Sequence, residues 1–453
     1  MGELKKELGL KEVVATVTSA VVGAGLFLTT VQIQQDVHLG SSVILSYIIS
    51  AIPATLVALC YATLAAAMPQ TGGDYIFMSR ILDPYVGFIV TWARWFGMIA
   101  TVSAVAIGDL SLVNSFLYLL GQQGAINFIN AHSLPIAIIE ILVFMIINYI
   151  GIKIYARVQL ALFIILMFGI GVLLTSGLPL IDLNNITSSF NGNLTDLVHG
   201  SAILFFSYIG FAAITDASGE VKNPERNLPI GMVLSVVLIA IIYISVSVFT
   251  YGVLPLNEVI QLGNVSAIAV RVLPSYLSII VSFGAFIALI SDINPEILAT
   301  SRLSLAWARD QVVPQRLSEL SRYNTPKWTL AVNASVAIAI VTLFGSFIDI
   351  LNIVNIAILL TYTVIGITTF VFPLKHPKRW AIAPVKIRGL WLLSTLSWVL
   401  TGLLFGILIA NSLTQFVLTL VWMGLGSIVY YNSIENHKLH AKMYEERKKK
   451  EGP

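Results

Sequence analysis

The stretch Ser207-Tyr-Ile-Gly-Phe211 lies inside an apolar run and is followed by Thr215-Asp216 and Glu220-Val-Lys-Asn-Pro224. Its glycine falls near the middle of a segment long enough to cross a membrane. A helix broken there frees backbone N–H and C=O groups that lipid cannot bind, so the groups must line a cavity or hold a ligand. Gly23-Ala-Gly25-Leu-Phe27 is a counterpart near the start of the chain. The sequence therefore predicts two broken helices, one opening each half of the protein.

The composition indicates a polytopic membrane protein. The 453 residues are 57% hydrophobic and 11% charged, with a mean hydropathy of +0.88, whereas soluble domains carry about 25% charged residues. The single cysteine, Cys60, excludes an internal disulfide and a cysteine-based metal site. The first apolar run is too long for a cleaved signal peptide, so we expect it to remain as a signal anchor.

Apolar runs of about 20 residues predict an all-α fold with twelve transmembrane helices. These spans lie near residues 12–37, 41–67, 85–119, 134–151, 154–177, 195–220, 230–253, 270–306, 328–346, 349–372, 391–410 and 413–433. The loops near 38–40, 120–133, 178–194 and 254–269 contain no Lys or Arg, whereas the alternate connections are basic. The positive-inside rule then predicts that both termini are cytoplasmic.

Spans one to five and six to ten have equal, odd counts, so the second block enters the membrane from the opposite side. This arrangement predicts an inverted repeat of residues 12–177 and 195–372 after a cytoplasmic segment 1–11. The two spans in 391–433 lie outside the repeat and are expected to serve packing or oligomerisation. The basic tail 434–453 is expected to be solvated in the cytoplasm, the alternative being attachment to anionic lipid.

Motifs for enzymatic chemistry are missing from the sequence. The six histidines have no metal-ligand spacing, and no nucleophile elbow or phosphate loop is present. We therefore expect no catalytic residues, no enzyme activity, no bound cofactor and no nucleic-acid partner.

Acidic residues inside the predicted spans are the stronger functional signal. They are Asp109, Glu140, Asp216, Asp292 and Glu296. A charge at mid-bilayer costs at least about 2.5–3.5 kcal/mol, and such residues usually face an interior and serve function. Fewer cations, Arg94 and Arg271, lie in the spans, so the interior is expected to attract a cationic substrate or a proton. The alternatives are a structural role for Glu140 and a backbone-capping role for Asp292.

Four segments together resemble the amino acid–polyamine–organocation transporters. They are Gly23-Ala-Gly25-Leu-Phe27; Pro69-Gln-Thr-Gly-Gly73-Asp-Tyr75 with Gly87-Phe88 and Trp92; Tyr208-Ile-Gly-Phe211 through Pro224 and Pro229-Ile-Gly231; and Asn294 with Ala299-Thr-Ser-Arg302, Ala308-Arg-Asp310 and Pro314. The resemblance implies alternating access by a five-plus-five inverted repeat with two extra helices.

The resemblance also implies a substrate site at the two breaks. The carboxylate of an amino acid would meet N–H groups around Ala24, Gly25 and Leu26. Its ammonium would meet carbonyls near Val21, Val22 and Tyr208 to Gly210, in agreement with the dipoles of half-helices. Phe205 and Phe211 would form an aromatic gate.

The chain departs from the family at positions that bear on coupling. Ala212 stands where many members have an acidic residue, and Leu166 where some proton-coupled members have a lysine. Thr300 and Ser301 resemble the hydroxyl pair of a sodium site, although hydroxyls also pack helices without an ion. Sodium and protons are therefore both candidate coupling ions.

These observations predict a secondary transporter of the cell membrane that imports or exchanges amino acids as a monomer or homodimer. Cationic amino acids are favoured, with Asp109, Asp216 and Glu296 as contacts for the positive side chain or a proton. A polyamine or neutral amino acid carrier, possibly driven by sodium, is the nearest alternative. Hypotheses from other functional classes are a nutrient-sensing receptor without translocation and an ion channel.

Overall fold

The computed structural model describes residues 4–23, 25–343 and 347–451, and it contains helices but no β-strand within those ranges. Nine described helices are long and apolar enough to cross a membrane. They are α3 (Val43–Ala67), α5 (Pro84–Leu119), α7 (Ser133–Ile150), α8 (Ile152–Gly177), α12 (Pro224–Gly252), α15 (Ser275–Arg309), α17 (Phe347–Lys375), α19 (Leu390–Asn411) and α20 (Leu413–Glu451). The structure therefore agrees with an all-helical membrane protein.

The first and sixth predicted spans are not continuous helices. The first consists of α1 (Leu10–Ser19), a π-turn (Gly25–Thr29), α2 (Thr30–Gln32) and a 3₁₀ turn (Ile33–Gln35). The sixth consists of α10 (Leu194–Leu204), a 3₁₀ turn (Phe205–Tyr208), α11 (Ala213–Asp216) and a second 3₁₀ turn (Ser218–Glu220). Both interruptions lie where the glycine-rich stretches predicted them.

The predicted eighth span, 270–306, is wrong at its start. Residues before Pro274 form a separate helix, α14 (Val265–Val272), and α15 begins only at Ser275. Proline forces the residue before it into an extended conformation, and Leu273 has φ −98° and ψ 154°. Hydrophobicity continues through this corner, so the apolar run alone did not reveal it.

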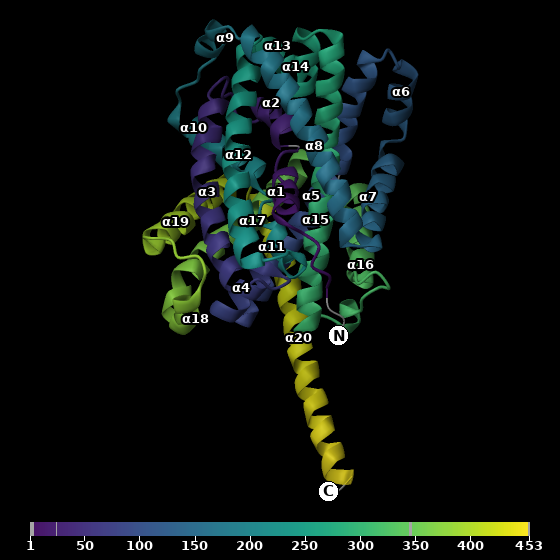
Figure 1. Cartoon of the computed structure of the whole chain (residues 1–453), viewed down its shortest axis with the longest axis vertical. Helices are drawn as coiled ribbons and strands as arrows, with labels where there is room; N and C mark the ends of the chain where they lie inside the picture. Colours follow the sequence, from purple (N-terminus) through teal and green to yellow (C-terminus); the bar gives the residue numbers. More distant parts are fainter. Residues whose placement is uncertain (1–3, 24, 344–346, 452–453) are drawn as a thin grey trace.

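Shorter helices complete the bundle. They are α4 (Gly73–Ile81), α6 (Gln123–Ala131), α9 (Leu183–Ser188), α13 (Leu256–Leu262), α16 (Lys327–Leu343) and α18 (Pro377–Ile382). Figure 1 shows α9, α13 and α14 gathered at one end, and α4, α18 and both chain termini toward the other. The tail after residue 433 continues α20 as one helix to Glu451 and projects from the bundle.

An aromatic contact attaches α20 to α5. The Trp92 indole N–H donates to the Trp422 carbonyl at 3.1 Å, and the Trp422 indole N–H donates to the Trp92 carbonyl at 3.2 Å. The two rings stack with centroids 5.1 Å apart. Buried indole N–H groups need an acceptor, and here each tryptophan supplies one to the other. This contact explains how a helix outside the predicted repeat is held on the bundle.

Candidate functional site

The two unwound segments lie directly against each other. A Cβ atom at Gly25 would lie 2.6 Å from Ser207 Cα, and a Cβ atom at Gly210 would lie 2.0 Å from the Ala20 carbonyl oxygen. Gly210 also has φ +114°, a conformation that side chains with a Cβ rarely adopt. Glycine is therefore required at both contacts, which is the physical reason for the pattern seen in the sequence.

Tyrosine hydroxyls hold the carbonyl groups that the breaks release. Tyr47 of α3 donates to Gly25 O at 2.8 Å, and Tyr243 of α12 lies within hydrogen-bond distance of both Val21 O and Ser207 O. Tyr243 thus touches an unwound carbonyl from each half of the chain. The sequence analysis did not single out these tyrosines. The available signal was that a tyrosine inside an apolar span needs a hydrogen-bond partner.

Replacing Tyr243 with phenylalanine is expected to reduce transport about tenfold. The change removes the one hydroxyl proton that Val21 O and Ser207 O share, and the loss of such a buried hydrogen bond costs about 1–3 kcal/mol. Initial uptake rates in proteoliposomes measure the effect, and the matched control is Tyr276→Phe, whose ring is 68% exposed. Wild-type uptake by the Tyr243 variant would show that its hydroxyl does not organise the breaks.

The backbone groups expected to bind an amino acid are partly engaged. The Leu26 N–H donates to Gly23 O at 3.1 Å, and Gly210 O accepts from Ala213 N at 2.9 Å. Val22 is fully buried, and Ala24 lies outside the described residues. Binding a carboxylate at the Leu26 amide would require this bond to be shared or broken.

The predicted aromatic gate residues meet at a third ring. Phe211 stacks on Tyr362 of α17 with centroids 5.1 Å apart, and Phe205 makes an edge contact with the same ring at 6.0 Å. The Tyr208 hydroxyl donates to Tyr47 O at 3.1 Å. All of these side chains are buried.

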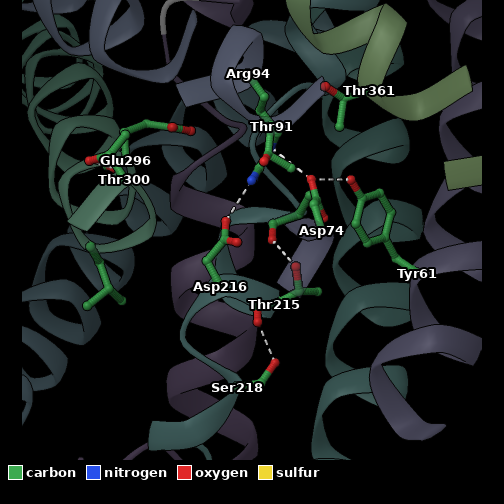
Figure 2. Close-up of polar contacts among 12 residues, drawn as sticks. Tyr61, Asp74, Thr91, Arg94, Thr215, Asp216, Ser218, Glu296, Thr300 and Thr361 are labelled. Atoms are coloured by element: carbon green, nitrogen blue, oxygen red, sulfur yellow. Dashed lines mark hydrogen bonds and ion pairs between the residues drawn. The ribbon is translucent and has the colours of Figure 1, made fainter. Parts of the chain in front are cut away.

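Asp216 lies in a buried ion cluster that the sequence analysis did not foresee. Arg94 Nη1 lies 2.7 Å from Asp216 Oδ2, and Arg94 Nε lies 3.0 Å from Asp74 Oδ2. The Tyr61 hydroxyl also donates to Asp74, at 2.8 Å. Figure 2 shows Arg94 between the two aspartates, with Tyr61 on the other side of Asp74. Asp216, proposed as a contact for a cationic substrate, already has a cationic partner.

Asp74 reaches this cluster because α4 folds back against α11. Gly72, with φ +94°, precedes α4, and a Cβ atom at Gly73 would lie 2.4 Å from Thr215 Oγ1. This close approach carries Asp74 from an apparent loop into the interior, where it is fully buried. The sequence shows that Asp74 follows the glycine pair Gly72-Gly73, but it does not show that this aspartate reaches Arg94.

The predicted sodium residues have other partners. Thr300 Oγ1 donates to Glu296 O at 2.8 Å, and Ser301 Oγ donates to Leu298 O at 2.9 Å. Ser301 Oγ also accepts from Arg302 Nη1 at 2.9 Å, while Arg302 pairs with both Glu220 oxygens. A guanidinium beside Ser301 would repel a sodium ion. This arrangement weighs against a sodium site there.

Two further carboxylates lie on one face of α15. Asp292 and Glu296 are buried, and no hydrogen-bond partner reaches Asp292 Oδ1 or Glu296 Oε2 among the described residues. Figure 2 shows Glu296 extending toward Arg94. Glu140 is partly exposed on α7. Asp109 belongs to α5, but its side chain lies outside the described residues.

Comparison with known proteins decides the family. The amino acid permease family profile matches residues 8–428. The chain belongs to the amino acid permease family. The resemblance to amino acid–polyamine–organocation transporters is thereby confirmed, and these membrane proteins are transporters and not enzymes. The matched region includes both breaks and every residue of the ion cluster.

Individual relatives of the permease are similar along most of their length. The methylthioribose transporter of Bacillus subtilis is 26% identical, over 92% of this chain and 91% of that protein. The branched-chain amino acid permease BcaP of the same species is 25% identical, over 96% and 94%. The vacuolar cationic amino acid transporter 4 of Arabidopsis thaliana is 27% identical over 82% of this chain but only 63% of that protein. The names of these relatives refer to chemically different substrates.

Proposed function

We propose that the permease is a secondary active transporter that imports or exchanges amino acids by alternating access, with cationic amino acids as the favoured class. The observation that supports this most directly is the contact between the two interrupted helices at Gly25–Ser207 and Ala20–Gly210. Unwound carbonyl groups favour a cation, and the N-termini of half-helices favour an anion. The two broken helices together therefore suit the ammonium and the carboxylate of an amino acid.

The proposed architecture has twelve spans in the cell membrane, with both termini in the cytoplasm and with 12–177 and 195–372 as inverted repeats. The presence of both termini at one end of the bundle supports an even number of crossings. Residues 391–433 would add two spans, and the protein would work as a monomer or homodimer. The segments 1–11 and 434–453 would lie in the cytoplasm.

Glu296 is the proposed contact for a positive substrate side chain. Asp216 is neutralised by Arg94, whereas Glu296 Oε2 is buried without a partner among the described residues. The buried, described charged groups comprise five carboxylates and two guanidiniums. An interior with this excess favours a cationic ligand or bound protons. A proton is the proposed coupling ion, because Arg302 lies beside the hydroxyl of Ser301.

A binding screen of the purified protein tests this proposal. A ligand that binds only the folded state raises its stability, by about 2.7 kcal/mol at one hundred times its Kd. We expect arginine, lysine or ornithine to raise the melting temperature, and Glu296→Gln to abolish that rise. The exposed Glu225→Gln is the matched control. A response to neutral amino acids alone would overturn the cationic assignment.

Transport assays separate the remaining alternatives. Saturable counterflow of a labelled amino acid in proteoliposomes is expected for an alternating-access transporter. Binding without counterflow would indicate a receptor, and flux that does not saturate would indicate a channel. Binding of a polyamine or methylthioribose in preference to amino acids would move the protein to another substrate class within the family.

A further inference from the structure

The carboxylate of Asp292 lies against the break in the first predicted span, where Gly23 lies between α1 and the π-turn. A Cβ atom at Gly23 would lie 3.0 Å from Asp292 Oδ2 and 3.2 Å from Asp292 Cβ. The aspartate is only 5% exposed, and Asp292 Oδ1 has no hydrogen-bond partner among the described residues. A buried carboxylate without a partner is strongly disfavoured when it carries its charge.

A proline interrupts the backbone hydrogen bonds of α15 close to Asp292. Pro295 has no N–H, so the Ser291 carbonyl loses its helical partner. The Gln159 side chain of α8 donates to that carbonyl at 3.0 Å and accepts from Asn294 Nδ2 at 2.8 Å. Asn148 of α7 extends the network by donating to Asn294 at 2.8 Å. The network supplies partners for Ser291 O and Asn294, but among the described residues it does not reach Asp292 Oδ1.

The surrounding charges distinguish Asp292 from Glu296. Glu296 lies within the field of Arg94, whereas the charged neighbour of Asp292 is Glu296, another carboxylate. The other described groups that interact electrostatically with the pair are Tyr243 of α12, Tyr155 of α8, Tyr362 of α17, Arg94 of α5 and Asp216 of α11. The charged residues of α1, Lys11 and Glu12, pair with each other in its first turn. Of the two carboxyl groups, Glu296 therefore has a guanidinium in its surroundings, whereas Asp292 has another carboxyl group.

We propose that Asp292 is a proton-binding site that couples the conformation of the broken first span to proton movement. This inference rests on the proposed transport function and names the residue that would hold the coupling proton. An ionised carboxylate only accepts hydrogen bonds, but a protonated one can also donate to a carbonyl of the unwound segment beside it. One proton from the aqueous phase forms an O–H bond with Asp292 when the site is open to one side. The same bond breaks, and the proton returns to water, when the site opens to the other side.

Infrared difference spectroscopy of the purified protein during a pH titration tests the site without any substrate. We expect a carbonyl band of a protonated, buried carboxylic acid that disappears at alkaline pH. Asp292→Asn should lack this band, Asp292→Glu should retain one at a shifted position, and the exposed Asp36→Asn should match the wild type. Gly23→Ala keeps the carboxyl group but crowds it, so the band should titrate at a different pH. An unchanged band in folded Asp292→Asn protein would overturn the proposal, as would a wild-type protein without a titrating band.

Proteoliposomes then test the coupling, with labelled L-arginine as the probe. We expect Asp292→Asn to retain arginine counterflow. The rate of arginine uptake driven by an imposed pH gradient should fall at least tenfold in this variant. Gradient-driven uptake at the wild-type rate in this variant would overturn the coupling role. Failure of the wild type to transport arginine would refute the proposed substrate class and leave the infrared result standing, so the two failures are distinguishable.

Discussion

Replacing Gly210 with alanine is expected to abolish measurable transport and to lower the melting temperature. The new Cβ atom would lie 2.0 Å from the Ala20 carbonyl oxygen and 3.2 Å from Ala20 Cβ, so the two unwound segments would have to separate. The residue would also be held at φ +114°. A side chain in such a conformation costs about 1–3 kcal/mol, and overpacking costs a similar amount. A combined penalty of about 2–6 kcal/mol corresponds to a loss of about thirtyfold or more.

The matched control for this variant is Gly171→Ala on α8. No atom lies within 4 Å of a Cβ atom built at Gly171, and alanine in a helix interior is favoured over glycine by about 1 kcal/mol. The same chemical change is therefore expected to be neutral or stabilising there. Uptake in proteoliposomes and thermal unfolding in detergent measure both variants. A Gly210→Ala protein that unfolds and transports like the wild type would show that the two breaks need not touch.

The features that could be predicted from the sequence are those set by local chemistry. Gly25 and Gly210 indicated the two breaks, because no other residue type tolerates such a close approach of two backbone segments. Helix limits followed from apolar length, as for α5, expected near 85–119 and found at Pro84–Leu119. Where a turn interrupts an apolar run without changing its composition, as at Pro274, the limit was missed.

The pairing of charges could not be predicted in the same way. Arg94 lies in α5, Asp74 in α4 and Asp216 in α11. Their contact depends on the packing of α4 against α11. A sequence shows that such charges need partners, but not which partners they find. The excess of interior carboxylates was foreseen, whereas the neutralisation of Asp216 and the isolation of Asp292 were not. Long-range packing determined which acidic residue is available.

Replacing Arg94 with methionine is expected to give the largest loss of stability of any single charge removal. Arg94, Asp74 and Asp216 are at most 2% exposed, so the variant would leave two carboxylates buried without their cation. Removing one partner from a buried pair costs about 3–5 kcal/mol. Arg94→Lys should fall between the wild type and Arg94→Met, because one ammonium cannot reproduce the two-sided contact of a guanidinium.

A triple variant separates two effects of the Arg94→Met change: the loss of the ion pairs, and the burial of two aspartates without a cation. Combining Arg94→Met with Asp74→Asn and Asp216→Asn removes all three charges, and neutral replacements of a buried ion cluster are often harmless to stability. The melting temperature in detergent is therefore expected to return most of the way to the wild-type value. If Arg94→Met alone were as stable as the triple variant, the two aspartates would not depend on Arg94. Recovery in the triple variant would instead show that Arg94 is needed because Asp74 and Asp216 are charged. That result would leave Glu296 and Asp292, and not Asp216, as the acidic residues free to meet a substrate or a proton.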